Sequence, residues 1–384
     1  PAPQRRGQGP RRRKRQNQDA NQGGGQGERA PGRRLPEQGD VAQHVARSLA
    51  VELLPAQQAG LAHARAVNPE AHELYLRGRY AWNKFNLEGF QQARDYFEQA
   101  TQKDPGYALA YTGLADAYAQ LSSRVLPPTQ AMPKAKQAAL KALALDPGLG
   151  EAHSSLAYVI HYYEWNWADA ERGYKRSMDL NPGYSLVHTV YAFYLSGRGQ
   201  FDQSLAEMKR GQELDPLFLG LKCGEIRLLY YARRYDQAIE IHRQMAELDP
   251  SLAGSCFWLV PAYEEKGMVR QAVSLAEASV SRLSGETLPM AMLAGAYART
   301  GRKREAADVL RKLPALSKQR YVSAYNMAVL YARMGDRDRA IEWLEKAVQE
   351  RAGLLVYLNV EPIFDPLRSD PRFRDLLRRM NFPP

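Results

Sequence analysis

Small side chains recur along most of this chain at a spacing of 34 residues. Ala93 is followed by seven alanine or serine positions at intervals of 42, 35 and then five times 34 residues: Ala135, Ala170, Ser204, Ala238, Ala272, Ala306 and Ala340. Twelve residues after each of the first five of these eight positions stands a proline, where a second helix should end: Pro105, Pro147, Pro182, Pro216 and Pro250. A period of this length predicts an array of stacked helical hairpins.

Bulky side chains recur in the same register and support this interpretation. One large residue recurs near the middle of the first helix of each hairpin, at Tyr118, Ile160, Leu195, Leu229, Tyr263, Tyr297 and Tyr331. Small residues let the two helices of a hairpin approach closely, and the bulky ones fill the space between hairpins. Eight hairpins between Ala71 and Arg351 resemble the tetratricopeptide repeat consensus. That resemblance implies an all-α, right-handed superhelix of about eight hairpins with a concave binding surface.

Charge and composition divide the chain into four parts. Residues 1–38 are rich in Gly, Gln, Arg and Pro and carry too few apolar side chains to offset chain entropy, which predicts a disordered basic tail or linker. Residues 39–70 are expected to form lead-in helices, because Asp40 can act as an N-cap and apolar residues follow at every fourth position from Val41 to Leu53. Residues 71–352 are the array, and residues 353–384 form an extended segment and a C-terminal capping helix.

The net charge of +11 comes mostly from the tail. Residues 1–40 hold ten Lys or Arg against four acids, which leaves 43 basic and 38 acidic residues for the rest. The run Arg11–Arg15 could bind phosphate backbones, but no aromatic side chain is interleaved to stack on bases, so the pattern favours a solvated linker over nucleic-acid binding.

The C-terminal residues have their own pattern. An apolar run, Leu354–Leu358, follows the last repeat helix, and Asp370 and Pro371 fit the N-cap and first position of a short helix. Phe373, Leu376, Leu377 and Met380 share one side of that helix, with Arg374, Arg378 and Arg379 for the outer face. We expect this segment to close the end of the array.

Three joints are longer than the period requires. They lie around Asn83–Gly89, Ser122–Thr129 and Trp165–Trp167. Loops inserted at hairpin joints are tolerated at small closure cost, so we expect these inserts to be neutral. The Trp165–Trp167 cluster is expected to fill the seam between repeats, with a cofactor box as a remote alternative.

The sequence contains no recognisable catalytic, cofactor or metal motif. Its seven histidines are scattered without a paired metal spacing, and no nucleophile elbow, phosphate-binding glycine loop or CxxC is present. We therefore expect no enzyme activity, no cofactor and no metal. No run of eighteen apolar residues indicates a membrane span.

Two cysteines bear on the compartment. Cys223 and Cys256 are expected on the first helices of adjacent repeats, and their spacing of 33 leaves them one position out of register, which does not favour a disulfide. A reducing cytoplasmic location is the default expectation.

The candidate binding site is the concave groove. By the geometry of the family, six positions of each first helix point into it, and aromatic and Arg side chains are the usual anchors of binding surfaces. A partner segment with apolar anchors and an acidic residue would suit such a groove, although aromatics in a solenoid also pack between neighbouring helices. The predicted groove residues are Tyr158, Tyr162, Phe193, Arg227, Tyr230, Tyr231, Phe257, Trp258, Arg299, Tyr325, Asn326 and Arg333.

More specific strings resemble a narrower group. The segments Tyr75–Lys84, Gly113–Tyr118, Tyr162–Trp167 and Tyr357–Phe373 resemble the C-terminal repeat region of certain bacterial multidomain signalling proteins. In that group the repeats follow a serine/threonine kinase, a winged-helix regulator or a cyclase, often with a TolB-like part between. The resemblance implies a protein or peptide partner and an effector domain joined upstream. It does not extend over residues 1–36.

Two alternatives stay open. A nucleic-acid-associated regulator would act through the Arg-rich tail, and a self-assembling scaffold would use the array to form homo-oligomers.

Overall fold

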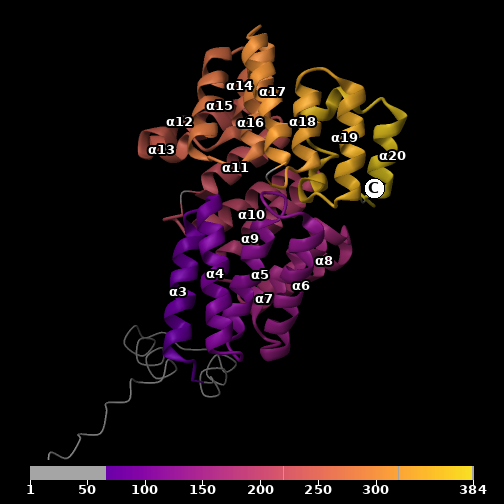
Figure 1. The fold of residues 1–384 in the computed structure, drawn as a ribbon. Helices are drawn as coiled ribbons and strands as arrows, with labels where there is room; N and C mark the ends of the chain where they lie inside the picture. The colour runs from indigo at the N-terminus through magenta and orange to yellow at the C-terminus, as the bar shows by residue number, and fades with distance from the viewer. Residues whose placement is uncertain (1–65, 219, 319, 383–384) are drawn as a thin grey trace, which may run out of the picture. The chain divides into compact units, whose positions relative to one another are not determined.

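The structure is a computed structural model that describes residues 66–218, 220–318 and 320–382, and every regular element in these ranges is helical (Figure 1). The elements form eight antiparallel hairpins. Their helices pair as follows: α3 (Pro69–Asn83) with α4 (Leu87–Lys103), α5 (Ala108–Leu121) with α6 (Pro128–Leu145), α7 (Gly150–Val159) with α8 (Trp167–Leu180), α9 (Ser185–Gly197) with α10 (Phe201–Leu214), α11 (Gly220–Tyr231) with α12 (Tyr235–Leu248), α14 (Val260–Glu265) with α15 (Val269–Arg282), α16 (Thr287–Arg299) with α17 (Lys303–Ser317), and α18 (Ala324–Arg333) with α19 (Arg337–Gln349). The predicted fold class, an all-α solenoid of about eight hairpins, is confirmed.

The small residues of the 34-residue period lie where the helices of each hairpin cross. All eight, from Ala93 to Ala340, are buried. Glycines serve the same purpose between α3 and α5, where a Cβ added at Gly78 or Gly113 would come within 2.6 Å of the ring of Phe97. The close approach therefore depends on the absence of side-chain volume at these positions.

The prolines end the second helices as expected. Asp104, Asp146, Asn181, Asp215 and Asp249 are the C-caps of α4, α6, α8, α10 and α12, and each is extended with φ between −145° and −136°. A proline follows each of them, and its ring disfavours the helical conformation in the residue before it.

The third hairpin takes up its extra residue in a π-helical turn. Residues Ile160–Glu164 form this turn, η1, and Trp165 follows with φ of 57°. A π-bulge inserts one residue into a helix without breaking it. It directs Trp165 and Trp167, both buried, into the joint.

The sixth hairpin is irregular, and this overturns the expectation for the cysteines. Its first helix is broken into α13 (Pro250–Ala253), the 3₁₀ turn η2 (Phe257–Leu259) and α14, so Cys256 lies in a turn instead of on a regular helix. Cys223 on α11 and Cys256 have their Cα atoms 5.4 Å apart and form a disulfide. The 34-residue register did not apply here. Persistent disulfides are typical of oxidising compartments, so this bond does not support the default expectation of a reducing cytoplasmic location.

The chain after α19 forms two 3₁₀ turns and a helix. These are η3 (Gly353–Tyr357), η4 (Pro362–Leu367) and α20 (Pro371–Arg379), which packs on α19. Asp370 caps α20 by accepting a hydrogen bond from the backbone N–H of Arg372, and Phe373, Leu376 and Met380 are buried. The basic tail and most of the lead-in segment lie outside the described residues.

Two of the longer joints contact distant parts of the array and are not neutral spacers. Arg124, in the joint before α6, forms an ion pair with Glu286 just before α16. The backbone N–H of Gly353 donates to the hydroxyl of Ser123 at 3.4 Å. In the joint after α3, the Phe85 ring meets that of Phe218 with centroids 5.7 Å apart. Early and late hairpins of the array are thus joined directly.

Candidate partner-binding groove

The twelve predicted groove residues all lie on first helices of hairpins three to eight, on α7, η1, α9, α11, η2, α16 and α18. Six of them contact the chain's own residues Gly353–Leu367, which we call the C-terminal segment. These six are Tyr162, Phe193, Arg227, Tyr230, Tyr231 and Tyr325. The first helices that were predicted to line the groove therefore contact a stretch of the same polypeptide.

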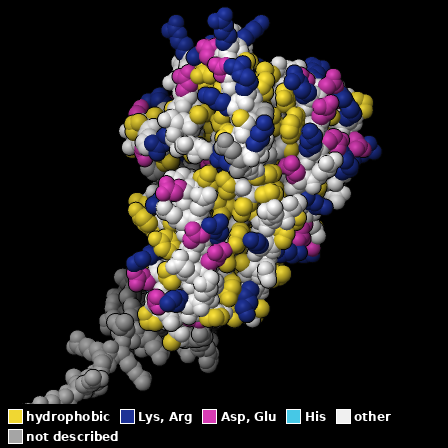
Figure 2. All heavy atoms as spheres, in the orientation of Figure 1, with side chains coloured by type: hydrophobic (Ala, Val, Ile, Leu, Met, Phe, Trp, Pro, Cys, Tyr) yellow, Lys and Arg dark blue, Asp and Glu magenta, His cyan; other side chains and the backbone are white. Residues whose placement is uncertain are grey.

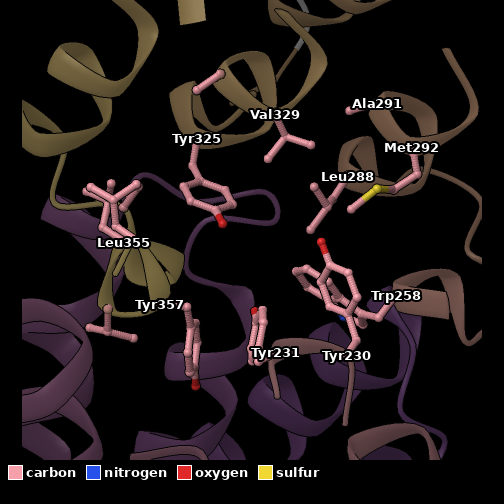
Figure 3. Packing of buried hydrophobic residues seen from close by; sticks show 14 of the residues in the cluster. Tyr230, Tyr231, Trp258, Leu288, Ala291, Met292, Tyr325, Val329, Leu355 and Tyr357 are labelled. Atoms are coloured by element: carbon pink, nitrogen blue, oxygen red, sulfur yellow. The ribbon is translucent and has the colours of Figure 1, made fainter. Parts of the chain in front are cut away.

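Tyr357 is the central aromatic contact. Its ring stacks on Tyr231 with centroids 5.0 Å apart and an interplanar angle of 20°. Phe193 and Tyr162 meet it edge-on at 6.3 Å and 6.1 Å, and the hydroxyls of Tyr162 and Tyr357 form a hydrogen bond. Figure 3 shows Tyr357 beside Tyr231, with Tyr325 directed toward them from α18.

Arg227 lies among four aromatic rings. Its guanidinium carbon is 4.3 Å from the Trp258 centroid and 4.4 Å from that of Tyr357, with Phe193 and Tyr231 at 5.0 Å and 5.3 Å. Nε donates to the Tyr231 hydroxyl at 2.9 Å, whereas Nη2 is buried without a hydrogen-bond partner among the described residues. Such a cation attracts the negative faces of the rings, so it holds the aromatic side chains of groove and segment together.

Glu361 supplies the acidic group. Its side chain is fully buried, and Oε1 accepts hydrogen bonds from the Tyr230 hydroxyl and, at 3.2 Å, from the backbone N–H of Ile363. Burial raises the pKa of this carboxyl to about 7, because desolvation disfavours the charged form more than these hydrogen bonds and the nearby Arg227 and Arg333 favour it. The segment thus presents an aromatic ring and, four residues later, a protonatable carboxyl.

The remaining predicted residues make contacts within the array itself. Arg333 and Arg299 both pair with Glu264, at 2.7 Å and 3.2 Å, and Asn326 donates to the hydroxyl of Thr287 at 2.7 Å. Tyr158 stacks on Tyr162 at 4.1 Å, and Phe257 packs on Trp258 at 5.1 Å. The structure does not bring Arg299 or Asn326 together with the aromatic cluster, whereas Arg333 lies close enough to Glu361 to favour the charged form of that carboxyl.

Sequence reasoning missed Tyr357 and Glu361 as groove residues. The apolar run containing Tyr357 was interpreted as a cover for the end of the array. The signal was nevertheless present, because this run followed by Glu361 has the apolar and acidic character that the groove residues were expected to bind.

The Trp165–Trp167 joint contacts the chain's C-terminal residues. The Trp167 indole N–H donates to the carbonyl of Met380 at 3.2 Å, and the Arg351 guanidinium lies 4.5 Å from the Trp165 centroid. A hollow of about 560 Å³ opens beside the two tryptophans, with Glu171 and Arg198 on its wall. The two tryptophans therefore pack between the third hairpin and the residues that follow the eighth hairpin.

Within the described ranges, no group of three or more His, Cys, Asp or Glu side chains is placed to hold a metal ion. None of the helices in those ranges is both long and apolar enough to cross a membrane.

Comparisons with known proteins gave one family match and distant matches among solved structures. Residues 321–352, which contain the eighth hairpin, match the tetratricopeptide repeat family. Curated proteins gave no match. Among solved structures, the crystal structure of yeast Tom70 is similar with a TM-score of 0.49 and 16% identity over 83% of this chain and 69% of that chain. A structure of PilF from Pseudomonas aeruginosa has a TM-score of 0.38 and 15% identity over 67% of this chain and 96% of that chain.

The eight hairpins and the family match define a tetratricopeptide-type α-solenoid. Solenoids of this class bind other proteins on their extended surfaces, so the chain is a protein–protein interaction scaffold.

Proposed function

We propose that this scaffold is the partner-sensing half of a bacterial signalling protein, and that it binds a peptide or domain of its partner in the groove of hairpins three to eight. The observation that carries the proposal is the C-terminal segment itself. It supplies an aromatic ring stacked on Tyr231 and a carboxyl bonded to Tyr230, so these first helices form a surface that takes up a polypeptide segment folded in short 3₁₀ turns.

The signalling role is supported by the resemblance of residues 75–84, 113–118, 162–167 and 357–373 to bacterial signalling proteins. On the face seen in Figure 2, basic and acidic side chains are interspersed, which favours a protein partner over nucleic acid for the array.

Site-specific photocrosslinking tests the binding site. We would place benzoylphenylalanine at Phe257, a partly exposed aromatic groove position, and in a matched variant at Lys209 on the exposed surface of α10. In an extract of the source cells, position 257 should crosslink to one protein, through a segment with aromatic and acidic residues identified by mass spectrometry. Equal crosslinking at both positions, or none at position 257, would contradict groove binding.

The signalling context has a separate test. Sequencing the source DNA upstream of the codon for Pro1 should reveal an open frame that encodes a kinase, winged-helix or cyclase domain. A start codon directly before Pro1 would make the chain a free-standing adaptor.

A further inference from the structure

The C-terminal segment contacts the groove through the groups that a bound peptide would use. Tyr357 enters the aromatic cluster around Arg227, and Glu361 reaches Tyr230. The segment also makes a polar contact at the groove rim, where the carboxylate of Asp365 pairs with Arg233 at 2.7 Å. These contacts join residues at least 130 positions apart in the chain, so the segment is positioned as a ligand supplied in cis.

The fit between segment and groove is incomplete. Four buried polar atoms at this interface and beside it have no hydrogen-bond partner among the described residues: Nη2 of Arg227, Oε2 of Glu361, the hydroxyl of Tyr325 and Nε of Arg333. Each unpaired buried group loses its hydration without a compensating bond. An occupant that gave the two arginines a further acceptor would bind the same surface more favourably.

The segment is flanked by two helices that are joined to each other by ion pairs of their own. On one side of the segment, α19 ends at Gln349. On the other side, α20 is joined to α19 by an ion pair of Arg379 with Glu345 and by an ion pair of Arg372 with Asp338 in the first turn of α19. If residues Gly353–Leu367 left the groove, α20 would keep these two ion pairs with α19 and would lose the contact of Phe373 with Phe364.

We propose that the C-terminal segment is a competing occupant that a partner displaces, and that the partner segment carries an aromatic side chain followed, four residues later, by a carboxylate. This inference rests on the proposed groove-binding function and names the chemistry and regulation of that site. Since the segment is tethered, its effective concentration is on the order of millimolar, and it suppresses binding of any weaker competitor.

A synthetic peptide with the sequence of residues 352–368, labelled with fluorescein, is the probe. Its binding to the full chain is measured by fluorescence anisotropy. The unaltered chain should bind the peptide weakly, because the groove is occupied in cis. The Tyr357→Ala chain loses the stack on Tyr231, so the peptide should bind it at least about tenfold more tightly.

Two further variants keep the test interpretable. Glu361→Gln is close in shape and should increase peptide affinity by a smaller factor even if Tyr357→Ala fails to fold, as judged by circular dichroism. Leu248→Ala, at a side chain that is 75% exposed on α12, should leave peptide binding unchanged. A peptide with both Tyr357→Ala and Glu361→Gln should not bind any of the chains.

Equal peptide binding by the unaltered, Tyr357→Ala and Glu361→Gln chains would overturn the proposal. A dimer that forms as the protein concentration rises, without any peptide binding, would also overturn the proposal. The segment would then be exchanged between two copies of the chain. Crosslinking from position 257 does not use the peptide. If the partner crosslinks there equally in the unaltered and Tyr357→Ala chains, groove binding stands and displacement is wrong.

Discussion

The two ends of the array differ in how much apolar surface they leave exposed. At the C-terminal end, Phe364, Phe373 and Leu376 are fully buried. At the first hairpin, Leu76 and Tyr80 on α3 are 53% and 72% exposed, beside a hollow of about 440 Å³. Repeats bury their apolar faces against neighbours, so a terminal repeat depends on a cap. The residues after α19 provide this cap, whereas none of the described residues covers Leu76 and Tyr80 of α3.

The largest expected effect tests whether the C-terminal cap is an integral part of the core. Phe364 is fully buried and meets the rings of Tyr325 and Phe373, so Phe364→Ala should lower the free energy of unfolding by about 3–5 kcal/mol. The matched substitution at the other end, Tyr80→Ala, should change it by less than about 0.5 kcal/mol. Urea unfolding followed by circular dichroism measures both. Equal losses would show that the ends do not differ in this way.

Reduction of the disulfide tests how much this bond adds to the stability that side-chain packing gives to the C-terminal half of the array. The bond between Cys223 and Cys256 spans 33 residues next to the Trp258 cluster, and its loss should destabilise the protein by about 3–4 kcal/mol. Thermal melts with and without a phosphine reductant would show this. A chain with both cysteines replaced by serine serves as the control, since its midpoint should not respond to the reductant. If the native chain is equally unresponsive, the bond does not contribute.

The pH dependence of the free energy of unfolding distinguishes the contribution of the buried carboxyl at the C-terminal end from that of the one nearer the first hairpin. Burial raises the pKa of Glu361 from 4.5 to about 7, so the folded state binds this proton more tightly than the unfolded state. Its contribution should be most favourable below pH 4.5 and decline as the pH rises to about 7, with a total loss of up to about 3 kcal/mol. Urea unfolding from pH 4.5 to 7.5 should show a flatter profile for Glu361→Gln.

Other buried groups titrate near this range and set the baseline for the comparison. Asp116 on α5, toward the other end, has its pKa raised to about 6 by burial, which gives a decline of the same sign. His161 has its pKa lowered to about 3 by burial, so its contribution increases with pH. Only the difference between the native and Glu361→Gln profiles reports Glu361. Parallel profiles would show that this carboxyl does not titrate abnormally.

The fold could be predicted from the sequence because its determinants are local and periodic. Ala93 and its counterparts recur where the two helices of a hairpin cross, and the five Asp-Pro or Asn-Pro pairs from Asp104 to Pro250 each end a second helix by their own backbone restriction. The spacing of small and bulky residues is therefore enough to predict the hairpin architecture without any tertiary contact.

The occupied groove could not be predicted in the same way. Whether residue 357 returns to residue 162 depends on the summed rotation of all intervening hairpins and on joints such as that around Arg124, and no local pattern encodes this sum. The disulfide was misjudged for a related reason. Residues 254–256 interrupt the sixth hairpin's first helix between α13 and η2, so the strict register no longer located Cys256.

The contact between Tyr162 and Tyr357 also bears on how such a gene can evolve. Open arrays of helical repeats can gain or lose whole units, because each unit touches only its neighbours. In this chain the third hairpin meets the residues that follow the eighth. Duplication or deletion of one unit between them would carry Tyr357 away from its site. We therefore expect the number of hairpins to stay fixed, and new binding specificities to arise through point substitutions and changes in the length of the joints.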